Sequence, residues 1–167
     1  MLQVIFEKVH PAAIIPTKAT PGAACWDVYS VEDATVEFGK VTIVDCGFKV
    51  KIPQGYEIVV RPRSGLAFKH GITIVNSPGT LDEDYRGPVK IAFTSVNQKC
   101  VLQPMFSEGD KIQDCGHYLG MAGGFKISKG DRVAQIALKK VESYEFVEGI
   151  VETDTERAEN GLGSTGK

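Results

Sequence analysis

Short segments in which apolar and polar residues alternate recur along this chain, and they constrain its fold more than any other feature. The apolar positions are mainly Val, Ile and Phe, and a Gly, Pro or Asn closely follows most segments, as in β-strands that end in turns. The alternating segments are Lys40–Ile52, Tyr56–Val60, Ile72–Val75, Val89–Val96, Arg132–Leu138 and Tyr144–Val147. Such a series predicts an all-β fold, built as an antiparallel sandwich or barrel.

One segment has the features of a short helix. Ser64–Lys69 begins with a residue suited to an N-cap, and Pro62 disfavours regular structure just before it. We therefore expect one short helix near residues 64–69 in an otherwise β-rich chain.

Two stretches lack a strand pattern and define the expected domain organisation. Residues 99–129 are glycine-rich and weakly periodic, and residues 153–167 are polar and glycine-rich. A connection as long as the first is usually functional or disordered, and a polar terminus is usually flexible. We expect a single domain over residues 1–152, with an inserted loop or subdomain at about 99–129, followed by a flexible arm at 153–167.

The composition argues against several classes of partner. The 167 residues include 19 Lys and Arg against 21 Asp and Glu, so no basic excess favours a nucleic-acid polymer. The N-terminus alternates like a strand and lacks the apolar core of a signal peptide, and no apolar run approaches membrane-spanning length. The four cysteines show no paired spacing. We expect a soluble, cytoplasmic protein that binds neither nucleic-acid polymers nor membranes.

The segment from Gly79 to Gly87, Gly-Thr-Leu-Asp-Glu-Asp-Tyr-Arg-Gly, carries more chemistry than a turn requires. A turn between two strands uses the glycines and tolerates one or two charges. It has no need for Asp82, Asp84 and Tyr85 together. Carboxylates beside an aromatic ring suit a site that positions a water molecule next to a flat, sugar-linked ligand.

Two other segments suit the binding of an anion. Arg63, Ser64 and Gly65 would place a guanidinium, a hydroxyl and free backbone N–H groups at one point, although an ordinary capped helix also explains them. Arg132 and Gln135 could both meet one polar ligand if their strand begins at a bulge.

Two cysteines and a histidine are candidates for metal ligands. Cys100, Cys115 and His117 lack a fourth ligand at a suitable spacing, so we expect no zinc centre there. A loop cysteine and a surface histidine account for these residues as well.

Five segments of the chain resemble, in the same order, the five sequence motifs of the trimeric dUTP diphosphatase (dUTPase) family. These segments are Ala19–Asp27, Pro62–Ala67, Gly79–Gly87, Gly130–Gln135 and Arg157–Gly166. The resemblance implies an antiparallel β-barrel or jelly-roll-like fold of the β-clip type. It also implies a homotrimer with shared sites that splits dUTP into dUMP and diphosphate, with Mg²⁺, by water attack on the α-phosphorus. Such an enzyme limits uracil incorporation into DNA and supplies dUMP.

The resemblance assigns roles to the residues of the third motif. Asp82 matches the family's general base, which accepts a proton from the attacking water. Tyr85 matches the tyrosine that packs against the deoxyribose and leaves no room for a 2′-hydroxyl. Asp84 and Arg86 are expected to hold the loop in shape, Asp84 by pairing with a nearby Arg. The main chain that lines the uracil pocket is expected at Asn76, Thr80, Leu81 and Lys90.

The first, second and fourth motifs are expected to hold the phosphates and the metal. Arg63, Ser64 and Gly65 match the second motif, whose hydroxyl and amides bind the phosphate chain, and Gln135 matches a phosphate contact of the fourth. Asp27 matches a water-mediated anchor for Mg²⁺, which the triphosphate itself carries for the most part.

The fifth motif is, in the family, a mobile tail that closes over a neighbouring subunit's site. Leu162 replaces the usual Phe that stacks over the uracil, and we expect a weaker lid as a result. The residues expected in this lid are Arg157, Leu162, Gly163 and Ser164.

The long connection at 99–129 departs from the family, which usually spans it with about a dozen residues or fewer. Its apolar content motivates one alternative, a regulatory protein of this fold that binds a protein partner through 99–129. A second alternative is an enzyme similar to dCTP deaminase, although Asp82 beside Tyr85 and the full Pro62–Ala67 match favour the hydrolase.

Overall fold

The computed structural model describes residues 2–96, 124–156 and 158. Within these residues the secondary structure consists of eleven strands and one short helix. The elements are β1 (Ile5–Lys8), β2 (Trp26–Tyr29), β3 (Ala34–Val36), β4 (Thr42–Asp45), β5 (Phe48–Lys51), β6 (Tyr56–Pro62), α1 (Ser64–His70), β7 (Ile72–Ile74), β8 (Gly79–Leu81), β9 (Lys90–Ser95), β10 (Phe125–Ile127) and β11 (Arg132–Lys140).

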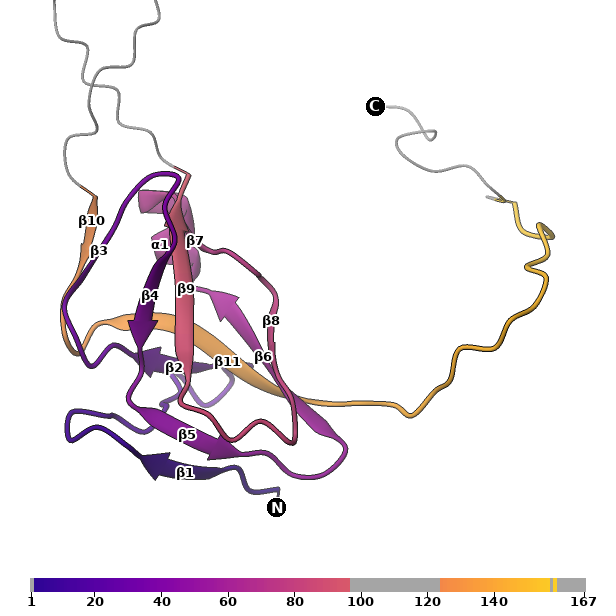
Figure 1. Ribbon diagram of the computed structural model, residues 1–167, viewed down its shortest axis with the longest axis horizontal. Helices are drawn as coiled ribbons and strands as arrows, with labels where there is room; N and C mark the ends of the chain where they lie inside the picture. The colour runs from indigo at the N-terminus through magenta and orange to yellow at the C-terminus, as the bar shows by residue number, and fades with distance from the viewer. Residues whose placement is uncertain (1, 97–123, 157, 159–167) are drawn as a thin grey trace, which may run out of the picture.

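The strands form four antiparallel sheets. β1 pairs with β5 and β3 with β10, whereas the two larger sheets have the orders β4–β9–β7 and β2–β11–β6–β8. Figure 1 shows the sheets arranged around a common interior, with α1 at one end and β1 and β5 at the other. The expected all-β antiparallel fold with one short helix is therefore confirmed.

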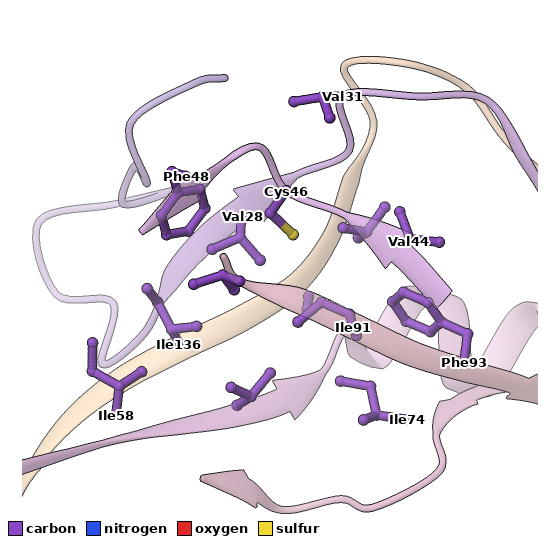
Figure 2. Packing of buried hydrophobic residues seen from close by; sticks show 14 of the residues in the cluster. Val28, Val31, Val44, Cys46, Phe48, Ile58, Ile74, Ile91, Phe93 and Ile136 are labelled. Atoms are coloured by element: carbon purple, nitrogen blue, oxygen red, sulfur yellow. The ribbon is translucent and has the colours of Figure 1, made fainter. Parts of the chain in front are cut away.

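Apolar side chains from all of the larger strands meet in one core. On β9, Ile91 and Phe93 are almost fully buried, because every second side chain of a strand points to the same face. Figure 2 shows the side chains that surround them, which include Val28, Val44, Phe48, Ile58, Ile74 and Ile136. The alternation in the sequence thus corresponds to the inner faces of these sheets.

The expected strand over Lys40–Ile52 is divided at Cys46 and Gly47. β4 pairs with β9, whereas β5 pairs with β1 in a different sheet, so the chain must change direction between them. Gly47 has a φ of +72°, and a Cβ there would lie 2.6 Å from Cγ1 of Val31. Only glycine fits both this backbone conformation and this space.

Part of the stretch expected as an excursion belongs to the barrel. Phe125–Ile127 forms β10, pairs with β3 and buries Ile127 in the core. The glycines around this strand hide its three-residue pattern in the sequence. Residues 97–123 lie outside the described residues.

The strand expected at Tyr144–Val147 is wrong. After β11 the chain continues through residues 141–154 without regular structure and leaves the barrel (Figure 1). Phe146 is 95% exposed and Ile150 is 96% exposed. The alternating pattern is present, but no strand of the described part of the chain pairs with it, and a strand needs a partner for its backbone groups.

The helix expected at Ser64–Lys69 is confirmed as α1, which extends one residue further. It ends at His70 because Gly71 adopts the left-handed conformation and its N–H donates to the carbonyl of Ala67. No helix among the described residues has the length and apolar character needed to cross a membrane.

Candidate functional site

A buried carboxylate brings together residues from three of the five motif-like segments. Asp27 lies on β2 and is 2% exposed. Its carboxylate accepts hydrogen bonds from Arg132 Nη1 at 3.3 Å and from Gln135 Nε2 at 3.1 Å. Arg63 Nε lies 3.3 Å from the same group. One carboxylate thus holds two guanidinium groups and one amide.

The pairing of β2 with β11 explains this convergence. Gln135 lies directly opposite Asp27, and the register shifts between Arg132 and Ala134. Side chains three positions apart on a regular strand point to opposite faces, and an inserted residue restores them to one face. The bulge that a shared ligand of Arg132 and Gln135 would require is present, and Val133 at the shift is buried in the core.

Arg63 links the end of β6 to the start of β11. Its Nη1 donates a 2.8 Å hydrogen bond to the carbonyl of Arg132. Its buried Nε has no hydrogen-bond partner among the described residues, because the Asp27 oxygen lies at ion-pair distance without the alignment of a hydrogen bond. This N–H is buried and faces the Asp27 carboxylate, so Arg63 helps to fix the cluster around Asp27.

The start of α1 differs from the sequence expectation. Arg63, with φ −81° and ψ 133°, is the N-cap, and Ser64 is the first helical residue. The extended backbone of β6 runs through Pro62, so Arg63 is the first position at which the chain can turn into the helix. No side chain of the described residues caps α1, and its first N–H groups lack intrahelical partners. The Ser64 hydroxyl and these N–H groups are left for a ligand.

Neutralising the central carboxylate should cost stability. We expect Asp27→Asn to lower the free energy of unfolding by about 1–3 kcal/mol, since it removes the charge that holds two guanidinium groups. Arg132 is 48% exposed, which limits the loss. Urea unfolding at one protein concentration measures the effect. The matched control is Asp154→Asn, an exposed carboxylate with no partner among the described residues. A loss no larger than in the control would contradict the role of Asp27.

The segment from Gly79 to Gly87 begins as a strand. β8 pairs with β6, with Gly79 opposite Val60 and Leu81 opposite Ile58. Thr80 is exposed and Leu81 is half-buried. Asn76 lies just before β8, and its side-chain amide contacts the position that a Cβ of Gly79 would occupy. The predicted uracil-pocket residues of this segment are therefore adjacent, while Lys90 lies on β9 with its Nζ 3.9 Å from Asp45 Oδ2.

Beyond β8 the loop is held by its own hydrogen bonds. The N–H of Tyr85 donates to the carbonyl of Asp82 at 3.1 Å, and the Tyr85 hydroxyl donates to the carbonyl of Pro88 at 3.0 Å. Arg86 Nη1 donates to the carbonyls of Glu83 and Tyr85. Asp82 is exposed beside this framework.

The expected pairing of Asp84 with an arginine is not found among the described residues. Arg86 is the nearest candidate in the sequence, but its guanidinium binds two loop carbonyls that would otherwise lack a donor. The expectation that Arg86 holds the loop in shape is confirmed by the same two contacts.

One contact in this loop gave no signal in the sequence. Oε2 of Glu83 accepts a 2.5 Å hydrogen bond from the N–H of Gly55, in the turn between β5 and β6. The two residues are 28 positions apart, and no local pattern relates them. Glu83 thereby fixes the loop against the start of β6.

Within one chain the two groups of residues lie at opposite ends of β6. Glu83 holds the Asp82 loop at Gly55, just before β6 begins, and Arg63 directly follows its last residue. The rise of an extended strand, about 3.3 Å per residue, puts Asp82 and Arg63 roughly 20 Å apart. In Figure 1 the β8–β9 connection and α1 likewise lie at opposite ends of the barrel. One chain does not bring Asp82 and the Asp27 cluster together.

The residues present do not form a metal cage. The described residues contain no cluster of three or more His, Cys, Asp or Glu that could hold an ion. Asp27 already faces two guanidinium groups, which does not fit direct coordination of a cation. Burial, with the charges of Asp45 and Glu32, raises the pKa of the Cys46 thiol to about 12, so it stays a protonated core residue. Cys100, Cys115 and His117 lie outside the described residues, as do Arg157, Leu162, Gly163 and Ser164.

Comparisons with known proteins point to one family. A family model described as dUTPase matches residues 11–112. A deoxyuridine 5'-triphosphate nucleotidohydrolase of Nautilia profundicola is 36% identical over 166 residues, which cover 99% of this chain and 100% of that protein. Its counterpart in Helicobacter pylori (strain P12) is 34% identical and covers 99% of this chain and 97% of its own length.

Solved structures of phage proteins share the fold. The dUTPase of Staphylococcus bacteriophage 80alpha with dUPNHPP has a TM-score of 0.80, is 25% identical, and covers 99% of both chains. A mutant dUTPase from phage phi11 of S. aureus, described with a structural Mg(II) ion, has a TM-score of 0.69, is 20% identical, and covers 93% of this chain and 99% of its own.

Proposed function

The chain belongs to the dUTPase family, and we propose that it hydrolyses dUTP to dUMP and diphosphate at sites that neighbouring copies of the chain build together. The family model and two relatives above 30% identity, each matched over nearly its whole length, support the reaction. The shared construction of the site rests on the position of Asp82 within a single chain.

The distance between Asp82 and Arg63, which lie at opposite ends of β6, is the observation that supports this proposal. A general base must lie within about 3 Å of the water that it deprotonates, and that water must attack a phosphate held by the binding groups. Asp82 and Arg63 lie roughly 20 Å apart in one chain by the strand rise. Asp82 of one copy therefore acts on a nucleotide whose phosphates are held by the Asp27 cluster of another.

Each half of such a site has a defined task. Asp82 accepts the proton of the attacking water, and Tyr85 packs against the deoxyribose. In the neighbouring copy, the guanidinium of Arg63, the hydroxyl of Ser64 and the amide of Gln135 bind the phosphate oxygens, together with the N–H of Gly65. The Asp27 carboxylate keeps Arg63 and Gln135 in place before the nucleotide arrives.

Exposed apolar side chains support assembly. The segment after β11 exposes large apolar residues that a soluble monomer rarely leaves in contact with water. These residues are Val141, Tyr144, Phe146, Val147, Ile150 and Val151. We propose that this segment crosses to another copy in a homotrimer, and that it brings Arg157, Leu162, Gly163 and Ser164 over that copy's site as a lid.

The metal enters with the substrate in this proposal. The dUTPase family uses Mg²⁺, and the donors around Asp27 do not form a cage for it. The triphosphate oxygens would hold the ion, which neutralises part of the phosphate charge when bound. A water-mediated contact between the ion and Asp27 stays a prediction.

Diphosphate release from four nucleotides tests the proposed function. With Mg²⁺, we expect release from dUTP, and at least about 100-fold lower kcat/KM for dCTP, dTTP and UTP, because the pocket and Tyr85 reject the wrong base and the ribose hydroxyl. Ammonia release from dCTP is measured in the same samples. Release of ammonia without diphosphate would favour the alternative of a dCTP deaminase. Diphosphate release from UTP as fast as from dUTP would contradict the role of Tyr85.

A further inference from the structure

Among the described residues, one side chain forms a hydrogen bond from the loop that carries Asp82 to another element. Residues 82–88 make most of their hydrogen bonds with one another. Within the described part of the chain, the Glu83 contact with Gly55 is the hydrogen bond that reaches from this loop to another element. Glu83 directly follows Asp82 in the sequence, so its side-chain contact anchors the backbone next to Asp82.

Gly55, the hydrogen-bond partner of Glu83, lies in a turn whose backbone is held in place. The N–H of Tyr56 donates to the carbonyl of Pro53 and closes the turn between β5 and β6, and Pro53 has a fixed φ. Gly55 has a φ of +77°, which other residues rarely adopt. Its carbonyl accepts a 2.9 Å hydrogen bond from the N–H of Val141, directly after β11. Gly55 is thus held on its carbonyl side while its N–H binds Glu83.

We propose that Glu83 is a positioning residue for the reaction, and that it acts through Asp82. Its hydrogen bond to Gly55 sets the orientation of the loop, and hence the place from which Asp82 accepts a proton. The contact also directs one of three consecutive carboxylates toward a backbone donor. This inference rests on the proposed function, in which Asp82 is the general base.

Steady-state kinetics with three variants test the inference. Glu83→Ala removes the acceptor, and we expect kcat for dUTP to fall by about 10- to 100-fold with KM within about threefold, since a misplaced base slows the chemical step more than binding. Glu83→Gln keeps an oxygen that accepts from Gly55 and should restore kcat to within about threefold of wild type. The control Glu37→Ala removes the same charge from an exposed pair with Lys40 and should leave kcat unchanged.

Amide hydrogen exchange supplies a readout that does not depend on turnover. We expect the Gly55 amide and the peptide over residues 82–88 to exchange at least about tenfold faster in Glu83→Ala, and at the wild-type rate in Glu83→Gln and Glu37→Ala. Normal kcat in Glu83→Ala overturns the inference, and so does a kcat in Glu83→Gln as low as in Glu83→Ala. If the wild type releases no diphosphate from dUTP, the proposed function fails, and exchange still decides whether Glu83 orders the loop.

Discussion

Asp82→Asn should reduce diphosphate release from dUTP by roughly 10²–10⁴-fold, the range that a general base contributes. The amide has nearly the shape of the carboxylate, but it cannot accept the proton that leaves the attacking water. Asp82 is exposed, and its side chain makes no hydrogen bond within the described part of the chain, so the substitution leaves the loop contacts intact. We therefore expect loss of kcat without loss of the fold.

Nucleotide binding separates this effect from a damaged site. The affinity of Asp82→Asn for a non-hydrolysable dUTP analogue should stay within about threefold of wild type, as expected when only a transition-state interaction is lost. Asp84→Asn is the matched comparison, because it changes an exposed carboxylate two positions away whose side chain has no partner in the described residues. If Asp84→Asn loses turnover and Asp82→Asn keeps it, the assignment of the base is wrong.

The long strands could be predicted from the sequence because they are runs rich in Val and Ile that end in turn residues. β9 buries every second side chain, whereas β6 and β11 also bury consecutive residues, such as Ile58–Val60 and Val133–Ala134. β8 and β10 were not predicted, since three residues between glycines carry too little pattern. Tyr144–Val147 shows the opposite case, in which a clear pattern lacks a partner strand among the described residues.

The first strand of the site was also hidden from pattern reasoning. On β2, Asp27 and Val28 are both buried although they point to opposite faces. Val28 enters the apolar core, whereas Asp27 enters the polar cluster with Arg63 and Arg132. In this short strand, burial on both faces leaves no alternating pattern in the sequence. The resemblance of its segment to a known motif was therefore the only signal for it in the sequence.

The candidate residues of the site could be proposed from the sequence, but the contacts between them could not. The resemblance pointed to Asp27, Arg63 and Gln135 separately, and their meeting at one carboxylate depends on the β2–β11 register and the bulge. The separation of Asp82 from Arg63 follows from which end of β6 each one occupies. The hydrogen bond from Gly55 to Glu83 joins two turns distant in the sequence, and only the folded chain shows it.

The central claim is that dUTP is hydrolysed at sites to which two copies contribute. Mixed assemblies of Asp82→Asn and Arg63→Ala copies test it most directly. If Asp82 and Arg63 act from different copies, a site between the two variants has either both defects or neither. If they act from the same copy, every site in a mixed assembly has one defect.

The measurement is diphosphate release from dUTP after the two variants are mixed in equal amounts, unfolded and refolded together, with different tags to confirm mixed assemblies. Random assembly in a ring leaves about one quarter of the sites intact, so the mixture should recover about 25% of wild-type activity. Each variant refolded alone should stay below about 1%, given the loss expected for either group. A mixture that contains mixed assemblies but remains as inactive as the separate variants would contradict the account.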